Sequence, residues 1–476
     1  MAVPQPRVRY YLHGRGELAH EKNIESITVS IETAGNAPVV AKSDVVIVGG
    51  GSAGVTAAVS AARNGCSVTL VERYHHLGGM ASGGMVLVLD DMVNGQEIVV
   101  AGIVEEFVQR MAKEDMAVFP PEDDRYASDE MYRKWARWGV HDFHQAKKPQ
   151  PIVYAVAFDP DAWKRTSLDL IRENDINLRL HSWFSDAIVE DGRIRGVVCQ
   201  TKMGRQAILG DIVIDTSGDL DVACSAGAEF SQGQYIVTTV FRLANVDTDE
   251  AMRFEYEEPE EFAKVNREAR RIIGGAWEMW WLRTPIPGVV WCNCPHMPGY
   301  DGITVEDLTA AEYEGRDRMM GLFEYVKGNM PGFEHANMLG AAEQVGVRTT
   351  RMLQGEYVVT KDDVISRRYF SDTVCRGRDY YTPYRALLPT KVDQLIVAGR
   401  HYSAEPEAQK RSREIPPCMA QGEVAGIAAS LALQHDTLIR DVDVRKIQNQ
   451  MRKQGADPGD VPSANATDVG DRAVNQ

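Results

Sequence analysis

The sequence lacks the long apolar run that a membrane-spanning helix requires. Its longest candidate, Val424 to Leu433, is rich in alanine and falls short of the roughly 20 residues needed to span a bilayer. The N-terminal residues also lack the apolar core of a signal peptide. We therefore expect no membrane insertion and a cytoplasmic location.

Basic clusters and paired cysteines are scarce as well. The 476 residues include 52 Lys and Arg against 68 Asp and Glu, which gives a formal net charge of −16. This balance argues against nucleic acid as a partner. The 7 cysteines are scattered, and Cys292 and Cys294 lack the second pair that a zinc site needs. We expect no disulfide framework and no metal site.

The most informative segment that is present covers residues 43–73, SDVVIVGGGSAGVTAAVSAARNGCSVTLVER. An apolar strand comes first, and Gly49, Gly51 and Gly54 then supply the pattern G-x-G-x-x-G. A helix of small residues follows, and a second strand ends in Glu72. In such a unit the first glycine permits a tight turn and the second lets a pyrophosphate approach the backbone. The third lets helix and strand pack closely, and the acidic residue binds a ribose hydroxyl. The segment predicts dinucleotide binding; the alternative is a glycine-rich turn in an ordinary β-α-β unit.

The remaining pattern predicts an α/β protein with more than one structural unit. Residues 26–32 alternate like a strand that joins a sheet edge, and Asp159 stands where it would cap a helix. Asp191-Gly192 predicts a hairpin turn. We expect an N-terminal arm (1–42), a discontinuous Rossmann-like domain (43–229 and 374–440), an inserted α+β substrate or cap domain (230–373), and a C-terminal helix with a mobile tail (441–476).

Three separated segments carry a more specific pattern. They are the glycine segment with its continuation Leu77-Gly78-Gly79-Met80, the stretch from Val213 to Asp219, and the C-terminal group formed by Tyr384–Pro389, Leu395–Arg400 and Pro416–Gly422. Together they resemble FAD-dependent oxidoreductases of the glutathione-reductase-like superfamily. More closely, they resemble the group related to fumarate reductase and succinate dehydrogenase flavoproteins.

This resemblance implies an enzyme that binds FAD in a Rossmann-like domain interrupted by the insert. It also implies which residues contact the cofactor. They are Gly49, Gly51, Ser52, Ala53, Gly54, Glu72, Arg73, Gly78, Gly79, Met80, Asp219, Gly399, Arg400, Cys418, Met419 and Ala420. The helix that begins near Pro416 would direct its positive end at the pyrimidine side of the flavin.

Hydride exchange with a flavin often needs a group that moves a proton. His401 and Tyr402 directly follow the predicted flavin contact at Arg400 and are the candidates; a structural role is the alternative. Arg413 is the candidate anchor for a carboxylate or carbonyl oxygen. Salt bridges are the alternative for it, as they are for Arg348, Arg351 and Arg385.

Two aromatic patterns leave alternatives open. His75 and His76 lie where relatives attach FAD covalently, but their spacing to the next glycines favours non-covalent binding and ordinary loop histidines. Four tryptophans of the insert are more typical of a core or a domain interface than of a pocket. They are Trp277, Trp280, Trp281 and Trp291.

We predict an FAD-dependent oxidoreductase that transfers a hydride between flavin N5 and a small organic substrate. The electron donor or acceptor is unknown, and a homo-oligomer is possible. The alternatives are a flavin-dependent monooxygenase and a non-catalytic FAD-binding subunit of a larger complex. The insert has no second glycine fingerprint, so we expect it to cover the flavin and to shape a substrate pocket rather than to bind NAD(P)H. His401 and Arg413 would face the flavin ring there.

Overall fold

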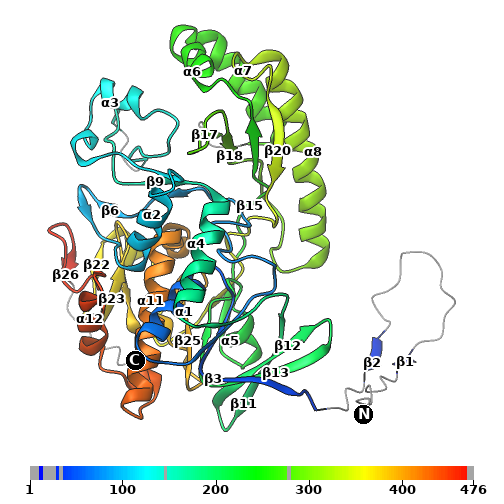
Figure 1. The fold of residues 1–476 in the computed structure, drawn as a ribbon, viewed down its shortest axis with the longest axis vertical. Helices are drawn as coiled ribbons and strands as arrows, with labels where there is room; N and C mark the ends of the chain where they lie inside the picture. The colour runs from blue at the N-terminus through cyan, green and yellow to red at the C-terminus, as the bar shows by residue number, and fades with distance from the viewer. Residues whose placement is uncertain (1–9, 14–27, 32–35, 144–146, 276–279, 469–476) are drawn as a thin grey trace.

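The protein is described here from a computed structural model (Figure 1). The structure describes residues 10–13, 28–31, 36–143, 147–275 and 280–468. Figure 1 shows a long molecule in which the insert, with α6, α7 and α8, lies at one end and the main sheet at the other. Among the described residues, none of the helices has the length and apolar character to cross a membrane.

A seven-stranded sheet forms the larger unit, and the α/β fold class that the sequence predicts is confirmed. Five of its strands run parallel and place their carboxyl ends at one edge. They are, in spatial order, β10 (Asn177–Arg179), β4 (Val68–Val71), β3 (Val39–Val48), β13 (Gly204–Asp215) and β25 (Leu395–Val397). β11 (Trp183–Glu190) and β12 (Arg193–Thr201) add an antiparallel hairpin beside β13, with the predicted turn at 191–192.

The carboxyl-terminal half of strand β3 is buried on both faces, as expected for the centre of a parallel sheet. Val45 and Ile47 pack into the core under the helices, whereas Val46 and Val48 pack on the opposite face. Because successive strand residues point to opposite faces, this run of valine and isoleucine serves two cores at once.

Helices cover one face of this sheet. α1 (Ser52–Arg63) lies against α11 (Ile415–Gln434), and the approach is so close that a Cβ atom on Gly422 would lie 2.1 Å from the Ala53 carbonyl oxygen. The Thr56 hydroxyl donates to the Met419 carbonyl oxygen at 2.8 Å. The other helices packed here are α2 (Ile103–Ala112), α4 (Pro160–Glu173, capped by Asp159 as predicted) and α12 (Val444–Lys453).

The insert has a core of its own. Its helices are α6 (Thr248–Glu257), α7 (Pro259–Ile272) and α8 (Val305–Asn329). Its antiparallel sheet has the order β17 (Trp281–Arg283), β18 (Val290–Cys292), β16 (Phe241–Ala244) and β20 (Asn337–Ala341). Trp280 and Trp281 are buried in this core, as the sequence predicts, while Trp277 lies outside the described residues.

The last part of the predicted insert packs with the main unit instead. β21 (Arg351–Leu353) pairs with β14 (Phe230–Gln232), and Leu353 joins the core beneath the main sheet. Val359 and Val364 belong to the core under the helices. Val345 and Val347 still pack with Met297 and with Ala311 of α8, so the residues that pack within the insert end near Val347, well before residue 373.

Both ends of the chain differ from the sequence expectation. β2 (Thr28–Ile31) pairs with β1 (Tyr10–His13) rather than with an edge of the main sheet. The segment 457–468, expected to be mobile, is anchored because the buried Arg376 guanidinium donates to Asp457 and to Ser463 at 2.7 Å. β26 (Thr467–Asp468) pairs with β22 (Arg368–Tyr369), and residues 469–476 lie outside the described part.

Candidate active site

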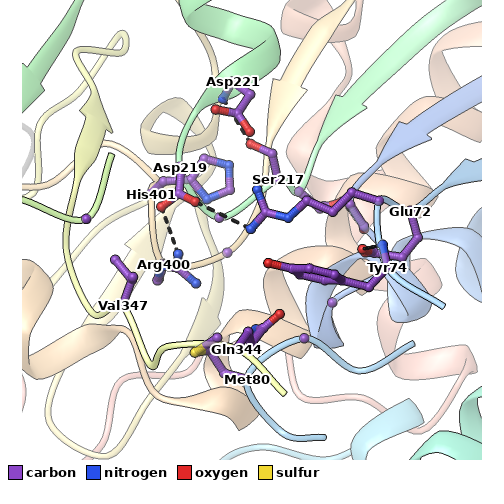
Figure 2. A pocket seen from close by; sticks show the side chains of 18 of the residues that line it. Glu72, Tyr74, Met80, Ser217, Asp219, Asp221, Gln344, Val347, Arg400 and His401 are labelled. Atoms are coloured by element: carbon purple, nitrogen blue, oxygen red, sulfur yellow. Dashed lines mark hydrogen bonds and ion pairs between the residues drawn. The ribbon is translucent and has the colours of Figure 1, made fainter. Parts of the chain in front are cut away.

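A cavity of about 550 Å³ opens where the parallel strands end (Figure 2). Open α/β sheets bind their ligands at this edge. Most of the predicted cofactor residues line it: Gly49, Gly51, Ser52, Ala53, Glu72, Arg73, Gly79, Met80, Asp219, Gly399, Arg400 and Cys418. The remaining predicted residues, Gly54, Gly78, Met419 and Ala420, lie behind the lining. We call this cavity the cofactor cleft.

Each of the three fingerprint positions requires glycine for a different physical reason. Gly49 has a φ of +105°, and a Cβ atom there would lie 2.3 Å from the Thr216 carbonyl oxygen. A Cβ atom on Gly54 would lie 1.8 Å from the Gly49 oxygen, which is the close packing predicted from the motif. On Gly51, the nearest atom to a Cβ would be Gly79 Cα at 3.9 Å. The protein leaves this space open at the N-terminus of α1, so the cleft fits a pyrophosphate there.

Glu72 directly follows β4 and carries a buried carboxylate that is already hydrogen-bonded. Its Oε2 accepts from Gly50 N at 2.7 Å and its Oε1 from Tyr74 N at 2.8 Å. Burial raises the pKa of Glu72 above its ordinary value, although both hydrogen bonds oppose this. An ionised carboxylate can accept further hydrogen bonds, so Glu72 suits the hydroxyl groups of a ribose.

The cleft has a flat, partly cationic wall beside Glu72. The Arg73 guanidinium carbon lies 5.0 Å from the centre of the Tyr74 ring and 5.6 Å from that of Trp183. All three residues line the cleft. Aromatic and guanidinium planes of this kind stack on nucleobases, so this end of the cleft suits the adenine of a dinucleotide.

Asp219 and Arg400 form an ion pair beside this wall, and Arg73 Nη2 lies 3.9 Å from Asp219 Oδ2. Asp219 Oδ1 accepts from Arg400 Nη2 at 2.8 Å (Figure 2). It also accepts from the Thr350 hydroxyl at 2.8 Å. Burial alone would raise the pKa of Asp219, but the charges of Arg400 and Arg73 hold it below its ordinary value. Asp219 is therefore ionised at neutral pH and can accept hydrogen bonds from the hydroxyl groups of a ligand.

His401 lines the cofactor cleft but is almost completely buried, with 1% of its surface exposed. Its Nε2 lies 3.2 Å from the Asp215 carbonyl oxygen and 3.3 Å from Asp215 Oδ1. Its Nδ1 has no hydrogen-bond partner in the described part of the chain and would lie 3.5 Å from a Cβ atom on Gly399. This placement favours a contact with the cofactor over the proton transfer predicted for His401.

Tyr402 lies away from the chemistry, so its predicted catalytic role is not supported. The side chain is fully buried, its hydroxyl lies 2.7 Å from Ser412 Oγ, and it lines no cavity described here. Residues 399–402 form a turn in which Tyr402 N donates to the Gly399 carbonyl oxygen at 3.1 Å, and this turn keeps Tyr402 out of both cavities although it follows Arg400 closely in the sequence.

A second cavity of about 670 Å³ adjoins the cofactor cleft and is lined by both the main unit and the insert. We call it the second cavity. It shares with the cleft the residues Met80, Val347, Arg400, Arg413 and Ile415. Arg413 thus lies where the sequence predicts an anchor. Trp291, predicted to serve the core or an interface, lines this cavity as well.

Sequence reasoning missed an acidic group in the second cavity. Asp90 follows β5 (Val88–Leu89) and lines the cavity with Glu414. Burial and the negative charge of Glu414 raise the pKa of Asp90 to about 8, while the charges of Arg413 and Arg378 oppose the rise. A carboxyl group with a pKa this close to neutral pH suits proton transfer. No motif marks Asp90, so only its three-dimensional surroundings reveal it.

The N-terminus of α11 offers a ligand fewer free N–H groups than a helix N-terminus usually does. Ile415 and Cys418 line the cofactor cleft. Pro416 and Pro417 have no N–H group, and Cys418 N donates to the Glu414 carbonyl oxygen at 3.2 Å. The helix end therefore acts on a ligand mainly through its dipole.

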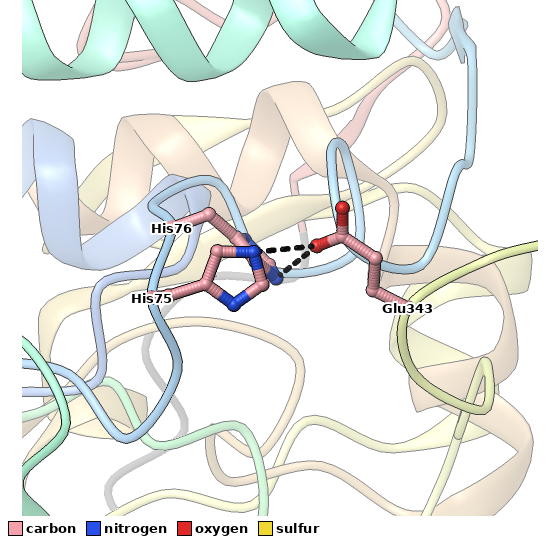
Figure 3. A group of neighbouring side chains, drawn as sticks. All are labelled: His75, His76 and Glu343. Atoms are coloured by element: carbon pink, nitrogen blue, oxygen red, sulfur yellow. Dashed lines mark ion pairs between the residues drawn. The ribbon is translucent and has the colours of Figure 1, made fainter.

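His75 and His76 form a cluster with Glu343 (Figure 3). His76 Nε2 lies 2.8 Å from Glu343 Oε2, and His75 Nε2 lies 3.7 Å from it. The three side chains could offer ligands to a metal ion, but Lys164 Nζ lies 2.7 Å from Glu343 Oε1, and its charge opposes a cation. Burial lowers the pKa of His76, so we interpret the cluster as a Lys164–Glu343 ion pair with a polar contact from His76, which together join two loops. Neither histidine lines the cofactor cleft.

The glycine fingerprint, the acidic residue after β4 and the open cleft define a dinucleotide-binding protein of the Rossmann type. Comparison with protein families extends this. The family described as FAD dependent oxidoreductase matches residues 44–378 and 376–451, and the chain belongs to this family. It is an FAD-dependent oxidoreductase, and FAD is its cofactor.

Comparison with solved structures finds distant likenesses. A geranylgeranyl bacteriochlorophyll reductase-like protein from Thermoplasma acidophilum is 13% identical, with 87% of this chain and 84% of that chain covered and a TM-score of 0.47. The p-nitrophenol 4-monooxygenase PnpA from Pseudomonas putida is 13% identical (86% and 84% covered, TM-score 0.43). The myxobacterial chondrochloren halogenase CndH is 13% identical (87% and 79% covered, TM-score 0.44). Values this low carry no argument about the reaction. A search of curated proteins finds no match.

Proposed function

We propose that this enzyme transfers a hydride between FAD and a small organic substrate held in the second cavity. The observation that carries the proposal is the contact between the two cavities. Met80, Val347, Arg400, Arg413 and Ile415 line both of them. A cofactor in the cleft and a substrate in the second cavity would therefore meet at these side chains.

The residues of the cleft have the chemistry to hold FAD along its length. Gly51 and the N-terminus of α1 suit the pyrophosphate, Glu72 suits the adenosine ribose, and Asp219 suits hydroxyl groups nearer the flavin. Bound FAD supplies the group that accepts or donates a hydride at N5. The parallel strand order and the Glu72 and Asp219 placements support the proposed kinship with the glutathione-reductase-like superfamily and the fumarate reductase group.

Asp90 is the residue best placed to move the accompanying proton. When the substrate is oxidised, a hydride leaves one substrate atom, and a proton leaves an adjacent O–H, N–H or C–H group for an Asp90 carboxylate oxygen. When the substrate is reduced, protonated Asp90 returns that proton. Arg413 lies between the two cavities, and its charge suits a substrate carboxylate or a carbonyl oxygen that becomes negative during the reaction.

The test is anaerobic mixing of the purified holoenzyme with a panel of organic acids, alcohols, amines and ketones, while the visible absorbance of the flavin is followed. We expect at least one substrate class to bleach the oxidised flavin or, after chemical reduction, to restore its colour. Arg413→Ala and Asp90→Asn should keep FAD and slow this step by about two orders of magnitude or more.

Arg267→Ala is the matched control, because this arginine is exposed on α7. Normal rates in both cavity variants would overturn the assignment of the second cavity. Flavin reduction by NADPH alone, followed by substrate-dependent oxygen uptake, would support a monooxygenase instead.

A further inference from the structure

The second cavity contains an arginine without an acidic partner. Arg348 Nη2 lies 3.3 Å from the Thr238 hydroxyl oxygen and 3.4 Å from His296 Nε2. Burial and the charge of Arg348 lower the pKa of His296 to about 4, so His296 is neutral at pH 7 and accepts this hydrogen bond. Within the described ranges, no Asp or Glu forms an ion pair with Arg348.

Arg348 nevertheless stays charged. Burial and the nearby charge of Arg413 lower its pKa to about 10, with Glu414 and Tyr235 opposing. At neutral pH a guanidinium with that pKa carries its full positive charge. A half-buried charge without a counter-charge is costly, so an anionic ligand beside Arg348 would stabilise the site.

Three of the other basic groups around the cavity have acidic neighbours, and the fourth, Lys148, is exposed, so solvent screens its charge. Arg400 is paired with Asp219 at 2.8 Å, and Lys410 is paired with Glu407 at 2.6 Å. Arg413 has Glu414 Oε1 at 3.9 Å and Asp90 nearby. Burial and the charge of Glu414 raise the pKa of Asp90 to about 8, so Asp90 adds little negative charge at neutral pH. Among the described lining residues, Arg348 is therefore the basic group shielded from bulk solvent that lacks an acidic partner.

The walls of the cavity are mostly apolar. Val88 comes from the main unit and Val240 and Leu282 come from the insert, while Tyr132, Tyr235 and Trp291 add aromatic surface. Trp291 is 3% exposed, and its indole Nε1 has no hydrogen-bond partner among the described residues. A cavity of about 670 Å³ has the size of a typical small-molecule site. Such walls favour a body of rings or branched hydrocarbon and disfavour sugars and polyphosphates.

We propose that the second cavity binds an organic monocarboxylate with an apolar body, and that Arg348 binds its carboxylate. The inference rests on the proposed function in taking this cavity as the substrate site. It goes further because it names the substrate class and the residue that selects it. Bidentate pairing with a carboxylate is a geometry that the planar guanidinium favours.

The test measures binding alone, so it needs no turnover. Benzoate, cyclohexanecarboxylate, benzamide and succinate are titrated into the oxidised holoenzyme, and the change in the visible spectrum of bound FAD is recorded. We expect benzoate and cyclohexanecarboxylate to bind at least tenfold more tightly than neutral benzamide and the dianion succinate. Arg348→Met should weaken the monocarboxylates roughly 30-fold or more and leave benzamide unchanged.

Two further variants keep the result interpretable. Arg348→Lys retains the charge and should recover part of the affinity, and Arg267→Met, on exposed α7, should bind as the unaltered enzyme does. FAD content and thermal stability of each variant are measured in parallel. Equal binding of benzoate and benzamide would overturn the proposal. So would an Arg348→Met variant that keeps the preference for carboxylates but loses affinity for FAD, since Arg348 would then serve the flavin.

The outcomes separate this inference from the proposed function. If only neutral substrates reduce the flavin, the proposed hydride transfer is supported and the proposal that the substrate is a monocarboxylate is wrong. Tight benzoate binding that depends on Arg348, without flavin reduction by any acid, would keep the binding site and overturn hydride transfer to that class.

Discussion

Arg400 Nη2 lies 2.8 Å from Asp219 Oδ1, and this ion pair joins the segment after β25 to the segment after β13. Arg400 lines both cavities, whereas Asp219 lines the cofactor cleft. The side chain between cofactor and substrate is therefore held by the protein's own charges. A partner already in place spares the site the cost of ordering Arg400 when ligands bind.

Replacing Gly51 with valine should abolish FAD binding while the fold survives. A Cβ atom there meets only Gly79 Cα at 3.9 Å, so the protein has room for a side chain, but the pyrophosphate does not. We expect colourless protein that cannot be reconstituted and whose circular dichroism is unchanged. Absorbance near the flavin maximum, measured before and after adding FAD, checks this.

Gly340→Val is the matched control for that experiment. Gly340 lies on β20 of the insert, and no atom lies within 4 Å of a Cβ built there. This variant should remain yellow. A Gly51→Val protein with normal FAD content would show that the cleft does not hold the pyrophosphate at this glycine.

The sequence predicts the cofactor cleft well because its determinants are local. Gly49, Gly51, Gly54 and Glu72 stand at fixed spacings within one β-α-β unit, and the parallel strands bring them to one edge whatever the rest of the chain does. Asp159 at the start of α4 is another local signal, since a cap acts on the next three residues. Such features need no knowledge of distant contacts.

The second cavity could not be predicted, because its residues come from separate segments without a shared motif. Asp90, Trp291 and Arg348 gain their roles from burial and from one another's charges. The sequence also shows where a residue lies along the chain, but not where its side chain points in the folded protein. Tyr402 and Arg413 flank predicted flavin contacts equally well, yet Arg413 lines both cavities and Tyr402 neither.

Acid precipitation should release the flavin into the supernatant. His76 Nε2 is held by Glu343 at 2.8 Å, and neither His75 nor His76 lines the cofactor cleft. Glu343 lines the cleft and holds His76 behind it, an arrangement that disfavours a covalent bond between this histidine and the flavin ring. Flavin fluorescence that stays in the washed pellet would contradict this, and its loss in His76→Gln would then identify the attachment.

Tyr402→Phe should lower stability without lowering turnover. The change removes one buried hydrogen bond, to Ser412 Oγ at 2.7 Å, and the Ser412 hydroxyl still has the Ala408 carbonyl oxygen at 2.9 Å. We expect a loss of about 1 kcal/mol in the free energy of unfolding. Denaturant unfolding and turnover on a substrate found in the panel test both parts. A tenfold fall in turnover at normal FAD content would restore Tyr402 as a catalytic residue.

Asp90 should make both stability and rate depend on pH in a window below about 8. Burial and Glu414 raise its pKa in the folded protein to about 8, whereas an unfolded chain releases the proton near pH 4. Between these values the folded state holds a proton that the unfolded state has lost, so its contribution to stability falls as pH rises. Asp90→Asn should remove the part of this slope that Asp90 contributes; the neighbouring Asp91, whose pKa is raised well above its ordinary value by burial and by the charge of Asp90, contributes with the same sign. Unfolding midpoints of both proteins at pH 5 and pH 8 measure the difference.

The sign of the rate change identifies the direction of catalysis. If Asp90 accepts a proton during substrate oxidation, flavin bleaching speeds up as pH rises through about 8; if it donates one during reduction, flavin reoxidation slows. Other buried carboxyls titrate in the same pH range, among them Glu423, whose pKa burial raises to about 7. The comparison with Asp90→Asn is therefore essential. Glu414→Gln removes a repelling charge and should shift the midpoint to lower pH. If neither substitution shifts the midpoint, the titration belongs to another group and Asp90 has no part in the proton transfer.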